Sequence, residues 1–193
     1  MVKNARDLII TLPNKHLRQA SESIEGLDSR VKKVINNMKL ATIDWEDHRD
    51  YEVGVALAAI QIDQPYRIVI VREDFDDKNN HKFMVLINPE VIKQSGKLVD
   101  DYEGCLSVQD VYGRVPRFEK ITIRALNEQG QKIKFSTKGF MARVLQHEID
   151  HLNGKLFVDL IKQNKNAFYK LDDTGQLIEL DYVKDIKQSD LFG

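Results

Sequence analysis

The chain has 193 residues, which is the size of one ordinary folded domain. Its 29 lysine and arginine residues nearly balance 30 aspartate and glutamate residues, so the formal net charge is -1. This balance excludes a global field that would draw in nucleic acid, an anionic membrane or a strongly acidic substrate. We therefore expect one domain over residues 1–193 that recognises its partners locally, without reading a nucleic acid sequence.

The N-terminal residues carry mixed charges and lead into a short apolar run from Leu8 to Ile10. This run is too short for a signal-peptide core or a membrane span, so the sequence predicts a soluble cytoplasmic protein. Cys105 is the only cysteine, which excludes an intrachain disulfide. Composition leaves two interpretations of this thiol: a buried apolar filler, or a group kept for its chemistry in a reducing compartment.

Residues 27–49 carry apolar side chains at steps of three and four, which predicts a helix with one buried stripe. Asp28 or Ser29 can cap its start, and Trp45 continues the stripe as a predicted core residue. From Tyr66 the pattern changes to two β-rich runs, residues 67–71 and 84–87. We expect strands that are joined by an exposed loop and closed by Asn88-Pro89.

Residues 121–126 and 131–135 alternate in polarity around a turn whose Gly130 suits a positive φ, which predicts an antiparallel hairpin. Residues 139–152 have helical spacing and end in Asn153-Gly154, a pair typical of a helix end. After Asp159 the chain becomes polar, with a turn signal at residues 172–175. We expect a polar C-terminal extension from about residue 160, formed as a surface tail with a small hairpin.

The segment from Gln146 to His151 carries the strongest chemical signal. His147 and His151 are four residues apart, so on a helix their imidazoles lie on one face and can bind the same divalent ion. Glu148 follows the first histidine and can act on water beside that ion. The pattern alone is also found on solvated helix faces, but Cys105 offers a third ligand. A thiolate with two imidazoles leaves the fourth position of a tetrahedral ion open, as in catalytic sites.

Two further segments suggest contacts with a ligand. In residues 103–107, Gly104 permits close backbone approach, and the residues after it can present an N–H group to a substrate. Residues 54–61 are rich in small side chains and end in Gln61, whose amide is a hydrogen-bond donor. Taken alone, this second segment predicts only a buried strand.

Together these segments resemble the three signature motifs of peptide deformylases: a glycine-alanine stretch ending in Gln61, then EGCLS, then QHExDHLxG. The resemblance covers roughly residues 53–159. It implies a metal-dependent hydrolase that removes the formyl group from the N-terminal formylmethionine of nascent chains and N-formylmethionyl peptides, releasing formate. The expected fold is α+β, with mainly antiparallel β-sheets around a central metal-binding helix and an additional N-terminal helix.

By that resemblance, Cys105, His147 and His151 bind one divalent metal ion and Glu148 is the general acid/base. Gln61 and the backbone N–H of Leu106 are the donors to the oxyanion. Fe²⁺ is favoured as the metal, and Zn²⁺, Ni²⁺ or Co²⁺ can substitute. The residues expected to contact the substrate, either along its extended backbone or around the methionine side chain, are Gly54, Val55, Ala56, Glu103, Gly104, Phe140 and Val144.

The chain departs from the family pattern at Ala56, where glycine is usual, and at Ile60, where proline is frequent. Two other functions stay open. One is a zinc endopeptidase of the HExxH type, whose third ligand normally lies downstream of the histidines. The other is a binding module with a structural ion.

Two arginines are expected to form ion pairs, and the chain is expected to act as a monomer. Arg143 is expected to form a structural ion pair, for example with Asp150, and Arg117 to pair with a carboxylate that the sequence does not identify. A monomer is adequate for the chemistry. Transient ribosome contact stays a hypothesis, because the polar C-terminal residues do not establish a ribosome-binding helix.

Overall fold

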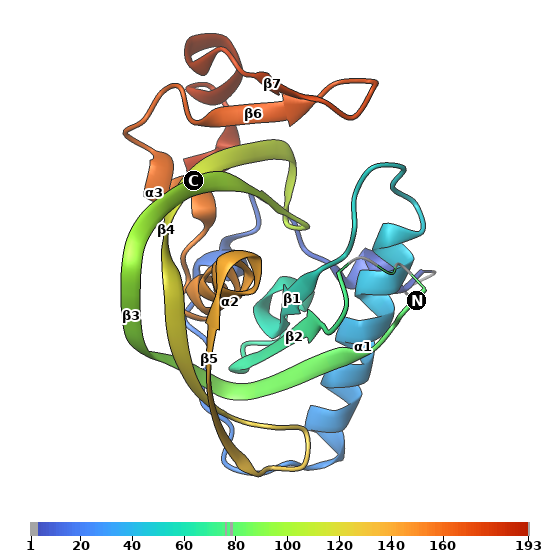
Figure 1. Ribbon diagram of the computed structural model, residues 1–193. Coiled ribbons are helices and arrows are strands. Elements are labelled where there is room, and N and C mark those ends of the chain that lie inside the picture. Colours follow the sequence, from blue (N-terminus) through green and yellow to red (C-terminus); the bar gives the residue numbers. More distant parts are fainter. Residues whose placement is uncertain (1–3, 76, 78, 193) are drawn as a thin grey trace.

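The N-terminal helix forms where its apolar stripe predicts it. The computed structural model describes residues 4–75, 77 and 79–192 (Figure 1). Helix α1 (Ser29–Glu46) is capped by Asp28, whose carboxylate accepts hydrogen bonds from the N–H groups of Arg30 and Val31, so the predicted cap is confirmed. The stripe is buried except at Trp45, which is only half-buried. The prediction of Trp45 as a core residue is therefore wrong.

The described strands form one seven-stranded sheet in which all neighbours are antiparallel. Its order is β1-β2-β3-β4-β6-β7, and β5 also pairs with β4. The two long strands, β3 and β4, curve around helix α2 (Gly139–Leu152), while α1 lies beside β1 and β2 (Figure 1). This arrangement confirms the expected α+β fold. The strands are β1 (Ala56–Ala58), β2 (Ile68–Arg72), β3 (Phe83–Cys105), β4 (Val108–Leu126), β5 (Lys132–Lys138), β6 (Phe168–Leu171) and β7 (Leu177–Glu179).

Strand β3 does not end at Asn88-Pro89, so that prediction is wrong. The strand runs for 23 residues to Cys105. Asn88 has a φ of 51°, and the register with β4 shifts between Ile87 and Glu90, so a β-bulge accommodates the proline and pairing resumes beyond it. Cys105 consequently lies at the tip of the β3–β4 hairpin, and residues 103–104 belong to the end of β3.

Strands β1 and β2 are buried on both faces, which explains why their sequences are apolar without alternation. Ile68 and Ile70 point to the cluster that includes the buried face of α1. Val69 and Val71 point to the cluster that includes Val144, Leu145 and Ile149 of α2. The first strands are thus held between the two long helices, and the short turn Ala59–Ile62 that follows β1 is fixed beside α2.

The predicted ends of the hairpin and of the second helix are confirmed. The turn between β4 and β5 contains Gly130 at a φ of 77°, and α2 is followed by Gly154 at a φ of 70°. Both glycines adopt the left-handed conformation that other residues disfavour.

The C-terminal region contains the predicted hairpin, formed by β6 and β7 around Gly175. A surface tail is nevertheless the wrong description. Phe168, Ile186 and Leu191 are buried in a third cluster with the short helix α3 (Phe157–Ile161), and β6 extends the sheet by pairing with β4. Among the described residues, no helix is long and apolar enough to cross a bilayer.

Candidate active site

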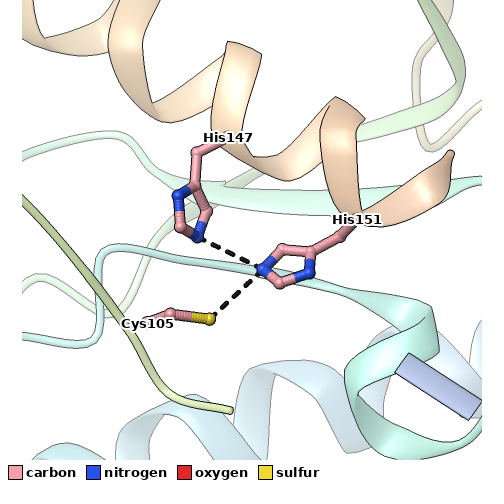
Figure 2. Close-up of side chains that lie close together, drawn as sticks. All are labelled: Cys105, His147 and His151. Atoms are coloured by element: carbon pink, nitrogen blue, oxygen red, sulfur yellow. Dashed lines mark hydrogen bonds between the residues drawn. The ribbon is translucent and has the colours of Figure 1, made fainter. Parts of the chain in front are cut away.

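Helix α2 and the tip of the β3–β4 hairpin bring three potential metal ligands together (Figure 2). Cys105 Sγ lies 3.2 Å from His151 Nε2, which in turn lies 3.2 Å from His147 Nε2. The three ligand atoms are within 4.8 Å of one another. The four-residue spacing places both imidazoles on one face of α2. Cys105, which is 42 residues upstream of His147, lies beside them because it ends the long strand β3. One sulfur and two imidazole nitrogens are a donor set that fits a divalent transition metal.

The buried carboxylate of Glu103 orients the imidazole of His147 through its Nδ1 atom. Glu103 Oε2 lies 2.9 Å from His147 Nδ1, which leaves Nε2 facing the cluster. Arg117 donates to both oxygens of Glu103 at 2.9 and 3.0 Å, and Arg143 donates to Oε1 at 2.8 Å. Burial opposes ionisation of this carboxyl, but the hydrogen bonds with His147 and Arg117 prevail and lower the pKa of Glu103 to about 2.

This network corrects two assignments, those of Arg143 and Glu103, and identifies the carboxylate partners of Arg117. Arg143 has the expected structural role, but it pairs with Glu103 and with backbone carbonyls at Val99 and Val115, whereas Asp150 accepts from Arg117. The carboxylate of Glu103 is occupied by these internal partners, so a role as a substrate contact through its side chain is not supported. The signal that could have identified the network is an acidic residue two positions before a ligand, in a chain where Arg117 and Arg143 are both expected to pair with carboxylates.

Glu148 is buried beside the cluster, and its Oε2 is without a hydrogen-bond partner in the part of the chain that the structure describes. Its side chain lines the same cavity as His147 and Cys105. Burial raises the pKa of Glu148 to about 7, which suits a carboxyl that must accept and release a proton near neutral pH.

The backbone N–H of Ala58 orients the side-chain amide of Gln61 toward the cluster. Oε1 accepts a hydrogen bond from Ala58 N–H at 2.8 Å, so the NH₂ group faces the other way. Nε2 lies 3.5 Å from Cys105 Sγ and 3.1 Å from Ser107 Oγ. Leu106 follows Cys105 in the turn between β3 and β4 and lines the cavity. Two potential donors, a side-chain amide and a backbone segment, therefore flank the thiol.

A cavity of about 180 Å³ opens onto the cluster. Six of the predicted substrate contacts line it: Val55, Ala56, Glu103, Gly104, Phe140 and Val144. Gly54 does not, because its N–H donates to Glu46 Oε2 at 2.8 Å and its carbonyl accepts from Arg72 Nε at 3.2 Å. The prediction for Gly54 is thus wrong: the glycine is needed because an added Cβ would come within 2.6 Å of Thr42.

Five lining residues were not predicted from the sequence: Trp45, Glu52, Val53, Tyr102 and Tyr112. Arg143, which was expected to have a structural role, also lines the cavity. Gly104 does allow a close approach, as expected, but to a tyrosine ring: an added Cβ would lie 2.6 Å from Cε1 of Tyr112. Behind the cavity, Glu46 and Arg72 form a buried ion pair at 2.6 Å that anchors the start of β1.

A Cys/His/His cluster at the end of a cavity, beside a buried carboxyl whose Oε2 has no hydrogen-bond partner among the described residues, defines the class of metal-dependent hydrolases. A model of the family described as "Polypeptide deformylase" matches residues 7–167. The chain therefore belongs to the polypeptide deformylase family.

Individual relatives agree with this assignment. The chain is 37% identical over 157 residues to a peptide deformylase of Pseudoalteromonas translucida, covering 81% of this chain and 87% of the relative. It is 40% identical over 158 residues to a peptide deformylase of Wigglesworthia glossinidia brevipalpis, with 82% and 97% covered.

Solved structures show the same fold. A peptide deformylase from Legionella pneumophila superposes with a TM-score of 0.70 at 37% identity, covering 79% of this chain and 83% of that one. A peptide deformylase from Synechococcus elongatus, solved in complex with actinonin, has a TM-score of 0.70 at 33% identity, with 79% and 78% covered.

Proposed function

We propose that this protein is a metal-dependent hydrolase that removes the N-formyl group from the N-terminal formylmethionine of newly made polypeptides and releases formate. The observation that carries the proposal is the convergence of Cys105, His147 and His151 beside the buried Glu148, whose Oε2 has no hydrogen-bond partner in the described part of the chain. Membership of the polypeptide deformylase family supports the identity of the substrate.

Cys105, His147 and His151 hold one divalent ion per chain in this proposal, with Fe²⁺ as the metal in the cell and Zn²⁺, Ni²⁺ or Co²⁺ as substitutes. When bound, the ion supplies a Lewis acid and lowers the pKa of water. Glu103 acts through His147 as a positioning residue, because it fixes the imidazole with Nε2 toward the cluster. Metal analysis of protein purified without oxygen tests the choice of ion, and predominant zinc would contradict it.

Glu148 is the general acid/base. It accepts a proton from the attacking water and passes that proton to the amine nitrogen as the bond to the formyl carbon breaks. Both steps need a carboxyl that changes protonation easily, and a pKa of about 7 meets this requirement. The Nε2 group of Gln61 and the backbone N–H of Leu106 donate to the oxyanion that develops on the formyl oxygen.

Replacing Gln61 by alanine is expected to lower kcat by about 10²–10³-fold with a small effect on KM, because the donor acts on charge present in the transition state. Steady-state formate release measures the effect. Gln129→Ala, in the exposed turn between β4 and β5, is the matched control. An equal loss in the control, or a change confined to KM, would refute the role of Gln61.

The methionine side chain packs against Val55, Phe140 and Val144. The extended substrate backbone lies between Ala56 and Gly104. Because the side chains along β1 are small, its backbone runs close to the bound formyl group and leaves little room for a larger acyl group. Selectivity is tested with three substrates at one protein concentration: a formyl-Met peptide, the acetyl-Met peptide of the same sequence, and casein. Cleavage of casein would instead support an endopeptidase.

The methyl group of Ala56 narrows the substrate channel, where the family usually has glycine. Ala56→Gly is therefore expected to lower KM for formyl-Met peptides several-fold while kcat is kept, in line with the effect of one methyl group in a pocket. Ala125→Gly is the control, since Ala125 also lies on a strand but packs in the core and does not line the cavity. Identical KM values for Ala56→Gly and the wild type would overturn this explanation.

We further propose that the whole chain acts as one catalytic domain and as a monomer in the cytoplasm, where a thiol ligand stays reduced. Light scattering tests the monomer. The structure gives no support to a ribosome-binding C-terminal helix, because residues 168–192 form a hairpin and short helical turns. Transient ribosome contact through another surface is tested by co-sedimentation.

A further inference from the structure

Basic side chains lie directly opposite one another on the face of the sheet that points away from α2. Strands β4 and β5 pair so that Lys120 lies opposite Lys138 and Arg124 opposite Lys134. All four residues are exposed. The alternate residues of β4 face inward and pack in the cluster that contains α2, around which the sheet curves (Figure 1): Ile121, Ile123 and Ala125. The outer face of this ladder is therefore polar and positively charged.

Two hydroxyl groups and a fifth cation complete this surface. Between the two basic pairs, Thr122 lies opposite Ser136, and their hydroxyl oxygens are 2.8 Å apart. Lys93 of β3 pairs with Thr122 and is also exposed. Among the described residues, the one ion pair found at these five cations joins Arg124 to Glu90 at 2.6 Å. The surface, here called the basic face, consists of Lys93, Lys120, Thr122, Arg124, Lys134, Ser136 and Lys138.

Folding of the sheet does not explain this concentration of charge. Like charges directly opposite one another destabilise a pair of strands. Lysine is common on edge strands, where it blocks pairing with other chains, and this accounts for β5, which pairs only with β4 among the described strands. It does not account for Lys120 and Arg124, because β4 has a partner strand on each side of both residues. The pattern indicates an anionic partner that neutralises the opposed cations.

The spacing of the basic face fits a partner with repeated anionic groups. Successive rows of the ladder lie two residues apart, or about 7 Å along the strands. A basic pair, a hydroxyl pair and a second basic pair therefore follow one another in a line. Lysine, arginine, serine and threonine are side chains that commonly contact the phosphates of nucleic acids. Binding to a membrane surface uses apolar anchors beside the cations, and these three rows contain none.

We propose that the basic face binds the phosphate backbone of RNA without reading its sequence. The choice of RNA rests on the proposed function, because newly made polypeptides emerge from the ribosome, a particle rich in RNA. None of the five cations lines the catalytic cavity, so RNA and a formylated peptide can be bound at the same time. The affinity should fall steeply with salt, since each phosphate contact releases counterions.

The test measures binding of the metal-loaded protein to a fluorescein-labelled RNA hairpin of about 20 base pairs by fluorescence anisotropy, from low to physiological salt. Lys120→Gln/Lys138→Gln removes one opposed pair. The control, Lys184→Gln/Lys187→Gln, removes the same charge from exposed residues of the C-terminal segment. We expect the first variant to raise Kd about 5- to 20-fold and to reduce the slope of log Kd against log salt by about 2, because two phosphate contacts are lost. The control should bind like the wild type.

Unchanged Kd and slope for Lys120→Gln/Lys138→Gln overturn the proposal, and so does an equal loss in the control, which would indicate a general effect of charge. Tighter binding to a DNA duplex of the same sequence, to phosphatidylserine vesicles or to polyglutamate would overturn the choice of RNA. Binding is measured without peptide, so its failure leaves the deformylase function intact. A protein that binds RNA but releases no formate overturns that function alone. Thermal unfolding verifies that each variant is folded, and removal of the opposed lysines should not lower the Tm.

Discussion

Replacing Glu148 by glutamine is expected to lower kcat for formate release by about 10²–10⁴-fold, the usual contribution of a general acid/base. Glutamine has the same shape but cannot shuttle the proton. Since Oε2 has no hydrogen-bond partner among the described residues, the change breaks no contact of that oxygen. Metal content and thermal stability should therefore stay close to those of the wild type. Formate release and metal analysis on the same samples measure both.

The matched control for this variant is Glu25→Gln, which makes the same chemical change at an exposed position. It should keep wild-type kcat. Activity of Glu148→Gln within about tenfold of the wild type would mean that another group carries the proton. A parallel loss of metal would instead assign Glu148 to binding.

Replacing Glu103 by alanine is expected to destabilise the metal-free protein by about 3–5 kcal/mol, the usual cost of removing one partner of a buried ion pair. The carboxylate is buried, and its loss leaves Arg117 and Arg143 short of their shared partner. Metal affinity should also fall by about 10–100-fold, because His147 loses its orienting contact. Urea unfolding with a chelator present measures stability alone, and metal titration measures affinity.

An exposed ion pair provides the control for Glu103. Glu90 and Arg124 lie 2.6 Å apart on the surface of the sheet, so Glu90→Ala should cost no more than about 1 kcal/mol. If Glu103→Ala is as mild as Glu90→Ala, the two arginines must find other partners, and the proposed positioning of His147 loses its support.

The features predicted from the sequence are those set by local patterns. Helix α1 and its cap at Asp28 follow from side-chain spacing and from one hydrogen-bonding residue. The imidazoles of His147 and His151 share a face because the helix repeat requires it. The β4–β5 turn needs a residue with positive φ, and Gly130 provides it. Each of these depends on residues within one or two turns of chain.

The features that were missed depend on partners far away in the chain. Strand β3 continues past Pro89 because β4 pairs with it on both sides of a bulge, and that pairing leaves no mark near the proline. The sequence predicted a substrate contact at Gly54, but its N–H donates to Glu46 and its carbonyl accepts from Arg72, both far away in the chain. Local composition also could not indicate that Phe168 and Ile186 are buried, because the side chains covering them come from several segments.

Formate release from a formyl-Met peptide by the protein, purified and assayed with Fe²⁺ under exclusion of oxygen, tests the central claim most directly. The proposed roles of Cys105, His147, His151 and Glu148 predict that formate and a free N-terminal amine appear in equal amounts. They also predict that a chelator stops the reaction and that Fe²⁺ restores it. Absence of formate from protein that carries bound metal would contradict the claim.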